Sequence, residues 1–260
     1  LALYEVANSY CTSNRDLYLK RIDRIKTKPN LAMIRGKVFH EILVRVLVRA
    51  KRLIYEKGVD HFQEILRKLS TPLDLNFLTV YRSQLTEEEF SELQKRASII
   101  ANFENARVAA RIQEILVKQP HIQEDSLATL AIPVVVEQKL DGTFFGLSAS
   151  LSADAFTFSE PMVLDLKFGE PKKFHRLSTT GYALVMEAIH EYPINLGCIV
   201  YAEFKGDRLI VKKDIHIIDD ELRQWFIEER DQKMRMIYEE IDPGLGNCYD
   251  SCPYILQCRG

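Results

Sequence analysis

Long hydrophobic runs are missing from this sequence. Of its 260 residues 47% are apolar, which is enough to bury one substantial core. The apolar stretch 38–48 is interrupted by His40, Glu41 and Arg45, and no stretch approaches the roughly 20 apolar residues that a membrane span needs. The N-terminus also lacks the basic-then-apolar pattern of a secretion signal. We therefore expect a cytoplasmic protein that does not enter a membrane.

The sequence also has no internal repeats, no low-complexity tracts and no G-x4-G-K-[ST] phosphate loop, which excludes a helicase motor within these residues. The net charge of −2 excludes a protein that is basic throughout. Residues 1–57 nevertheless contain thirteen Lys and Arg against five acids, so this segment carries +8 and the remainder −10. A basic lobe suits a phosphate backbone lying along one side of the molecule, although a solvated helical face explains the pattern equally well.

Cysteine is scarce, with five residues in the chain. Cys248, Cys252 and Cys258 lie within eleven residues, and Cys11 lies at the opposite end. The odd number and the missing secretion signal argue against a disulfide framework, and in a reducing compartment such a cluster more often binds metal. Four thiolates can surround an iron–sulfur centre, with zinc as the competing possibility. Cys198 is expected in the core of a strand.

The spacing of apolar residues predicts an α/β fold with a mixed central sheet flanked by helices. Helices are expected first, at 34–57, 59–69 and from Thr86 to about 118. After Pro120 we expect strands at 128–139, 144–158 and 162–168, the first two joined by an Asp141-Gly142 hairpin. A helix at 174–191, strands at 195–204 and 208–217 and a last helix at 219–241 complete the order. The expected parts are 1–33, a basic segment with one cluster cysteine; 34–125, a helical region; 126–217, the core; and 218–260, a helix with the remaining cluster cysteines.

The most informative motif is Val163-Leu-Asp165-Leu-Lys167. Alternate residues of a strand face the same side, so Asp165 and Lys167 lie side by side. Asp154 belongs to the preceding strand, and antiparallel pairing would let both aspartates converge on one Mg²⁺ or Mn²⁺. Such a cation promotes phosphodiester hydrolysis, and a nearby ammonium can orient the water. An ordinary surface ion pair is the alternative for an isolated D-x-K.

A histidine on the first long helix extends this pattern. His40 lies one turn after Gly36, where the lack of a side chain could let another element approach closely. A lone helical histidine is more often solvated or hydrogen-bonded. In residue type and order, however, the sequence resembles the RecB-like PD-(D/E)XK nucleases through His40, Asp154, Asp165-x-Lys167 and Tyr182.

The resemblance covers about 128–204 for the core and 34–57 for the first helix. It implies a restriction-endonuclease-like core whose metal ligands are His40, Asp154, Asp165 and the main-chain carbonyl of Leu166. It further implies catalytic roles for Asp154, Asp165, Lys167 and Tyr182. The chain departs from the family at the Q-x3-Y motif, where Ser178 replaces the glutamine.

One cysteine before such a core and three after it are similar to the iron–sulfur nucleases. This resemblance implies that Cys11, Cys248, Cys252 and Cys258 hold a cluster, with 4Fe-4S expected first and 2Fe-2S or zinc behind it. Because Cys11 and Cys248 are so far apart in the sequence, the two ends of the chain must meet. A chain of this length best resembles the fourth family of CRISPR-associated proteins. The segment 10–19 and the helical insertion 59–118 resemble its larger archaeal type I-A sub-family.

The resemblance implies a Mg²⁺- or Mn²⁺-dependent nuclease that trims single-stranded or frayed DNA ends 5′ to 3′ for insertion into a CRISPR array. Other CRISPR adaptation proteins would be its partners. Among the basic N-terminal residues, we expect DNA contacts from Arg15, Lys20, Arg21 and Arg24. The rival hypothesis is a non-catalytic DNA-binding or scaffold subunit of the adaptation complex, which Ser178 favours.

Overall fold

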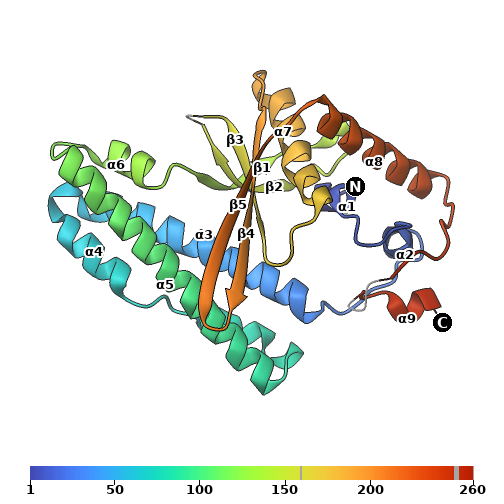
Figure 1. Ribbon diagram of the computed structural model, residues 1–260, viewed down its shortest axis with the longest axis horizontal. Coiled ribbons are helices and arrows are strands. Elements are labelled where there is room, and N and C mark those ends of the chain that lie inside the picture. Colours follow the sequence, from blue (N-terminus) through green and yellow to red (C-terminus); the bar gives the residue numbers. More distant parts are fainter. Residues whose placement is uncertain (159, 249–251, 260) are drawn as a thin grey trace.

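The structure, a computed structural model, describes residues 1–158, 160–248 and 252–259. Its centre is a five-stranded sheet in the order β1-β2-β3-β4-β5 (Figure 1). The strands are β1 (Val135–Leu140), β2 (Leu151–Thr157), β3 (Met162–Lys167), β4 (Leu196–Lys205) and β5 (Arg208–Ile217). β3 and β4 pair in parallel and the other neighbours pair antiparallel, so the expected α/β class with a mixed sheet is confirmed.

Helices occupy most of the first 131 described residues and separate or follow the later strands. The α-helices are α1 (Leu3–Ala7), α2 (Arg15–Arg21), α3 (Leu31–Lys57), α4 (Phe62–Ser70), α5 (Glu87–Lys118), α6 (Glu124–Ala131), α7 (Arg176–His190), α8 (Asp220–Tyr238) and α9 (Ile255–Arg259). Short 3₁₀ turns are η1 (Val59–His61), η2 (Asn76–Gln84), η3 (Thr143–Phe145) and η4 (Lys173–His175). No helix in the described part of the chain is long and apolar enough to cross a membrane.

The sheet has helices on both faces. Tyr201 and Phe204 of β4 point to opposite faces, because they are separated by an odd number of positions. Tyr201 contacts His175 at the start of α7, with 5.7 Å between ring centroids. Phe204 lies 5.9 Å from the Phe39 ring of α3 and beneath Arg96 of α5. The α7 layer and the α3–α5 layer therefore enclose the sheet between them.

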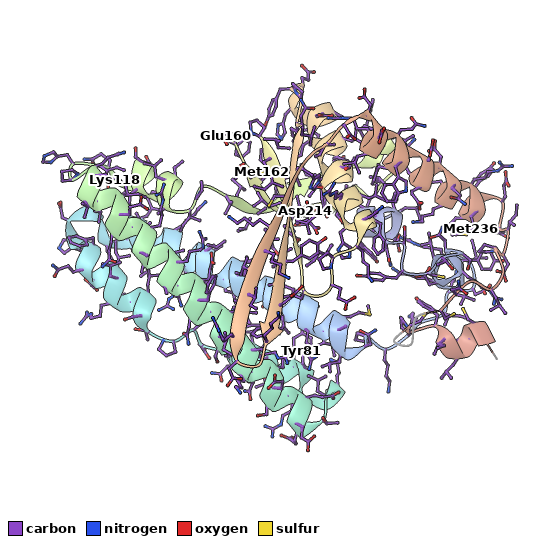
Figure 2. The ribbon with its side chains drawn as sticks, viewed as in Figure 1. Tyr81, Lys118, Glu160, Met162, Asp214 and Met236 are labelled. Atoms are coloured by element: carbon purple, nitrogen blue, oxygen red, sulfur yellow. The ribbon has the colours of Figure 1, made fainter. Side chains whose placement is uncertain are left out.

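The long helices α3 and α5 pack along each other and form the arm seen on one side of Figure 1. Their starts are capped: Asn30 accepts a hydrogen bond from Met33 N–H, and Thr86 and Glu89 form a reciprocal capping box. Figure 2 shows Tyr81 and Lys118 near opposite ends of this arm. The capped starts and the continuous apolar stripes explain why the sequence predicts these two helices well.

The expected strand at 128–139 is wrong in its first half. Residues up to Ala131 belong to α6, and β1 begins only at Val135. Glu124 and Asp125 lie in the first turn of α6, where acidic side chains favour a helix start. Leu127 is fully buried against α3 and α5. Pro133 then favours extended backbone in the residue before it, which ends the helix.

The expected strand at 144–158 also begins later, at Leu151. β1 and β2 do pair antiparallel, but the link is a longer loop that includes η3. The Asp141 carboxylate accepts hydrogen bonds from the Thr143 amide and hydroxyl at 2.9 and 2.7 Å, which starts the η3 turn. Leu147 is buried in the loop and anchors it to the core.

Candidate active site

A cleft of about 560 Å³ opens where α1, the first half of α3, the strands β2 and β3, and α7 meet. All the residues that the sequence predicts for metal binding and catalysis line it. The walls are formed by Leu3, Tyr4, Met33, Gly36, Lys37, His40, Asp154, Asp165, Leu166, Lys167, Phe168, Ser178 and Tyr182.

The pairing of β2 with β3 brings the two aspartates together. Ala155 pairs with Leu164, so the same register continued by one residue sets Asp154 opposite Asp165. Directly opposed residues of antiparallel strands point to the same face. The Leu166 N–H donates a hydrogen bond of 2.9 Å to Asp154 Oδ2, which holds that carboxylate beside β3.

Asp165 is the most buried carboxylate of the cleft, with 6% of the residue exposed. Burial raises the pKa of Asp165 to about 6; the nearby Lys167 opposes this rise and Asp154 adds to it. Lys167 Nζ lies 2.8 Å from Asp165 Oδ2. Burial alone would lower the pKa of Lys167, but Asp165 and Asp154 raise it, so the ammonium stays charged. Two close carboxylates in a buried place favour a bound cation.

His40 closes the site from the side of α3. Its Nε2 lies 3.2 Å from Asp154 Oδ1. His40 Nε2 and Asp165 Oδ2 are both buried. Each has an ion-pair contact, to Asp154 and to Lys167, but neither has a hydrogen bond of normal geometry with any described residue. Buried polar atoms without such a hydrogen bond are rare in proteins. An imidazole nitrogen beside carboxylate oxygens is a donor set that Mn²⁺ and Mg²⁺ accept, so these residues fit a divalent cation. As the side chains stand, no three His, Cys, Asp or Glu residues of the described chain are placed to hold a metal ion.

Two further cleft residues come from α7. The Tyr182 hydroxyl donates a hydrogen bond of 2.6 Å to the Ser152 carbonyl, which ties α7 to β2 two residues before Asp154. Burial raises the pKa of Tyr182, and the two aspartates raise it further, so its hydroxyl stays protonated. Ser178, at the position of the family's glutamine, is buried one turn earlier on the same helix.

The expectation for Gly36 is wrong. A side chain there would meet no atom within 4 Å, so no other element of the protein approaches it closely. Gly36 instead faces the open space of the cleft.

Of the four basic residues expected to contact DNA, three form ion pairs within the protein. Arg15 binds Asp242 through two nitrogens, at 3.0 and 2.9 Å. Lys20 and Arg21 both bind the buried Glu5. Arg24 is exposed and forms no ion pair with the described residues. Lys20 also contacts Tyr4, so it lies at the edge of the cleft.

The four clustered cysteines lie together where the ends of the chain meet. Cys11, Cys252 and Cys258 are buried and Cys248 is partly buried. Burial raises the pKa of both the Cys252 and Cys258 thiols, and the other clustered cysteines add to this rise. The three residues between Cys248 and Cys252 lie outside the described residues. Cys198 lies in the core of β4, as expected.

Hydrogen bonds tie the two ends at this place. Arg15 Nη1 donates to the Cys258 carbonyl at 3.3 Å, and the Asn247 N–H donates to Thr12 Oγ1 at 2.9 Å. A side chain on Gly246 would lie 2.6 Å from the same Thr12 oxygen, so the two segments touch. Figure 1 shows both termini on the same side of the molecule.

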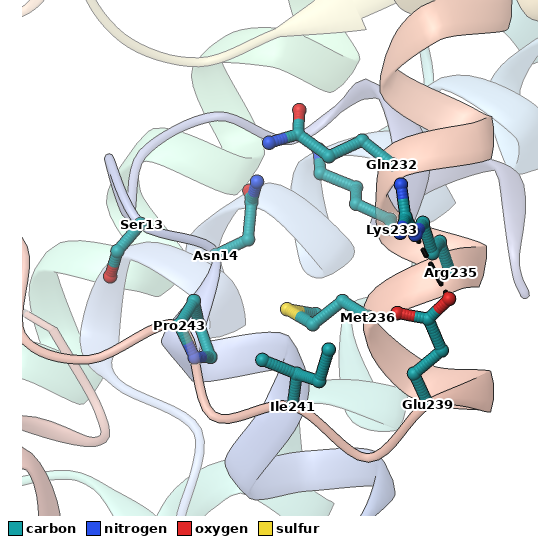
Figure 3. Close-up of a pocket in the computed structure, with 9 residues that line it drawn as sticks. All are labelled: Ser13, Asn14, Gln232, Lys233, Arg235, Met236, Glu239, Ile241 and Pro243. Carbon is teal, nitrogen blue, oxygen red and sulfur yellow. Dashed lines mark hydrogen bonds and ion pairs between the residues drawn. The ribbon is translucent and has the colours of Figure 1, made fainter.

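A second hollow, of about 220 Å³, lies between the start of α2 and the end of α8 (Figure 3). Asn14 and Met236 both line it, and Arg235 and Glu239 beside them are ion-paired at 2.9 Å. The Lys233 amine is already used, because it donates to the Val6 and Asn8 carbonyls at 2.7 and 2.8 Å. None of the predicted catalytic residues lines this hollow.

Sequence reasoning missed a partly buried network near Lys167. His175 Nε2 lies 3.0 Å from the Tyr10 hydroxyl, and its Nδ1 lies 3.1 Å from the Tyr201 hydroxyl. Tyr10 is 165 positions from His175 in the sequence and Tyr201 is 26 positions away, so no local sequence pattern could predict these contacts. Tyr10 is the neighbour of Cys11 in the sequence, and the network therefore joins the cysteine-bearing segment to the sheet.

A mixed sheet that aligns two aspartates and a lysine in a cleft, with a histidine from a neighbouring helix, suits the metal-assisted hydrolysis of phosphodiesters. The family model of the CRISPR-associated exonuclease Csa1 matches residues 1–260. The chain therefore belongs to the Csa1 family of CRISPR-associated exonucleases, which confirms the family expected from the sequence.

Two curated relatives support this assignment. The CRISPR-associated exonuclease Csa1 of Saccharolobus solfataricus is 27% identical over 96% of this chain and 82% of its own length. The Csa1 protein of Thermoproteus tenax is 26% identical over 100% of this chain and 84% of its own length. Among solved structures, the crystal structure of SSO0001 aligns with 70% of this chain and 88% of its own, at 12% identity and a TM-score of 0.26. A score that low supports no conclusion about the fold.

Proposed function

We propose that this chain is a divalent-metal-dependent DNA nuclease with a PD-(D/E)XK-type core. The observation that carries the proposal is the convergence of Asp154, Asp165 and His40 in one cleft, where two buried ligand atoms have ion-pair contacts but no hydrogen bond of normal geometry. His40, the two carboxylates and the Leu166 carbonyl are the proposed ligands. When bound, Mn²⁺ or Mg²⁺ would polarise the scissile phosphate and lower the pKa of an attacking water.

The protein's own groups have separate tasks in this proposal. The Lys167 ammonium, held at 2.8 Å by Asp165, provides a positive charge for the phosphate as negative charge develops on it. Leu166 N–H fixes the orientation of Asp154. Tyr182 keeps α7 in register with β2 through Ser152, so it positions the ligands.

The proposed substrate is single-stranded or frayed DNA, trimmed 5′ to 3′ to prepare fragments for insertion into a CRISPR array. The support is the family membership and the two relatives, both of which are named CRISPR-associated exonucleases. Other CRISPR adaptation proteins are the proposed partners.

We also propose that the four clustered cysteines hold an iron–sulfur cluster, 4Fe-4S before 2Fe-2S or zinc. The support is their shared location, their burial and their chemistry, since four thiolates suit a soft metal centre. A cluster there would join the two ends of the chain, as Arg15 and Asn247 already do.

A cleavage assay tests the nuclease proposal. Single strands labelled at the 5′ or the 3′ end, frayed duplexes and blunt duplexes are incubated with Mn²⁺, Mg²⁺ or EDTA. We expect cleavage with the cations, none with EDTA, and loss of the 5′ label first. Lys167→Ala should reduce the rate by about 100-fold or more, since it removes a charge that acts in the transition state.

The matched control is Lys213→Ala, which removes an exposed lysine of β5 that does not line the cleft. Its rate should equal that of the unmodified protein. DNA binding without cleavage under any of these conditions would reject the nuclease and favour the scaffold subunit.

A further inference from the structure

Two large side chains are exposed at the mouth of the active-site cleft. Tyr4 of α1 is 60% exposed and Met33 of α3 is 53% exposed, and both line the cleft. Aromatic rings beside positive charges are the groups that bind unpaired nucleotides, because every base offers a face for stacking. The Tyr4 ring is therefore available to a nucleic-acid strand that enters the cleft.

A series of ionic contacts orients Tyr4 without covering it. The Lys20 ammonium donates a hydrogen bond of 2.5 Å to the Tyr4 hydroxyl and lies 4.9 Å from the ring centroid. Lys20 is itself ion-paired with Glu5 at 2.7 Å, and Glu5 is only 5% exposed. A ring that is ordered before binding loses little conformational entropy when a base stacks on it.

Another wall of the cleft is one face of α3. Met33, Gly36, Lys37 and His40 follow one another at helical spacing, and all of them line the cleft. Gly36 leaves open space beyond its Cα, and the exposed Lys37 forms no ion pair with any described residue. This face offers room and one unneutralised positive charge on the way to His40.

We propose that Tyr4 is a stacking platform for an unpaired base next to the cleaved phosphate, and that Lys37 neutralises a neighbouring phosphate across the cleft. Gly36 provides the room in which the sugar–phosphate backbone passes. The proposal rests on the proposed nuclease function and specifies its substrate: a strand whose bases near the cut are unpaired. Inside a duplex both faces of every base are covered by its neighbours, so a base must be unpaired or frayed to enter the cleft and stack on Tyr4.

The test measures binding with cleavage prevented by EDTA. Short single strands carry the fluorescent base 2-aminopurine at each of the first few positions in turn, because stacking on a ring quenches its emission. Tyr4→Leu should remove the quenching and weaken binding by roughly ten-fold or more, as expected for one lost base–aromatic contact. Tyr4→Phe keeps the ring, so the quenching and the affinity should both be retained.

Lys37→Ala should lower the slope of log affinity against log salt by about 0.7, as for one lost phosphate contact on a single strand.

Tyr238→Leu is the matched control, since Tyr238 is 90% exposed at the end of α8 and does not line the cleft. It should bind and quench like the unmodified protein. Unchanged affinity and quenching in Tyr4→Leu would overturn the platform, even if the protein cleaves DNA. Quenching that depends on Tyr4 in a protein that never cleaves would support the platform and reject the nuclease.

Discussion

At the scale of single residues, His175 shows how a buried side chain ties the active-site sheet to the N-terminal segment. It is 3% exposed, and both ring nitrogens face tyrosine hydroxyls. Burial, helped by the positive charges of Lys167 and Lys172, lowers the pKa of His175 to about 4. The imidazole is therefore neutral in the folded protein at neutral pH.

This buried histidine predicts a pH dependence of stability. In the unfolded chain His175 has a pKa near its ordinary 6.5, so between about pH 6.5 and 4 only the unfolded chain binds the proton. The free energy of unfolding should be fully present above pH 6.5 and fall as the pH drops through this window, by up to about 3 kcal/mol from this group. Urea unfolding at pH 7.5, 6 and 5 measures the fall.

His175→Gln should be less stable at every pH, because it loses hydrogen bonds, but its stability should fall less steeply with acid. The matched control is His121→Gln, in an exposed turn, which should keep the slope of the unmodified protein. If His175→Gln has that same slope, the histidine is not buried in its neutral form.

The residues of the candidate site differ in how far the sequence alone could predict them. Asp154, Asp165 and Lys167 follow from the period of two along a strand and from the pairing of consecutive strands. His40 needed the resemblance to a family, because the approach of α3 to β2 is a tertiary contact. Tyr4 could not be predicted, since its role depends on a cleft that five separate elements build.

At the scale of elements, the sequence predicted helices and strands correctly where the periodic pattern of apolar residues extended over many residues. The helices α3 and α5 and the strands β3, β4 and β5 were placed within a few residues. It failed at α6, whose eight residues are too few to show a clear helical period and whose Leu127 is buried against α3 and α5. The α1 helix, with five residues, was missed for the same reason.

Two helical glycines give opposite predictions for the same substitution. In α7, a Cβ on Gly181 would lie 2.4 Å from the Phe226 ring and 3.1 Å from Leu3, where α7 meets α8 and α1. Phe226 is fully buried and cannot swing away. Gly181→Ala should therefore lower the free energy of unfolding by roughly 1–3 kcal/mol.

Gly36→Ala in α3 is the matched change, since its Cβ meets nothing within 4 Å. It should raise the free energy of unfolding by about 0.5–1 kcal/mol, as alanine is the better helix former. Urea unfolding midpoints compare the two variants. Equal losses in both would mean that α7 does not approach α8 as closely as the structure has it.

At the scale of the whole molecule, contacts with α8 and the segment that follows it hold the N-terminal segment in place. Arg15 binds Asp242. Lys233 of α8, which is only 1% exposed, donates hydrogen bonds to the carbonyl of Val6 in α1 and to that of Asn8 just after it. The sequence showed the imbalance of charge but not these partners, because each contact spans more than 220 residues. Arg15, Lys20 and Arg21 are therefore all ion-paired within the fold, and Lys20 lies beside the cleft.

The cysteine proposal makes the last prediction, because a cluster would join residues that are 247 positions apart. Protein purified without oxygen should be brown and contain iron, and Cys11→Ser and Cys252→Ser should each lose the visible absorption. Loss of the link should lower the melting temperature by roughly 5–15 °C, since metal binding that joins distant segments contributes directly to folding stability.

Cys198→Ser is the matched control: Cys198 is equally buried, but in β4, so this variant should lose some stability through packing and keep its iron and its colour. Colourless protein with one equivalent of zinc would replace the cluster by a zinc site, and full iron content in Cys11→Ser would show that the two ends are held together by Arg15 and Asn247 without a shared metal centre.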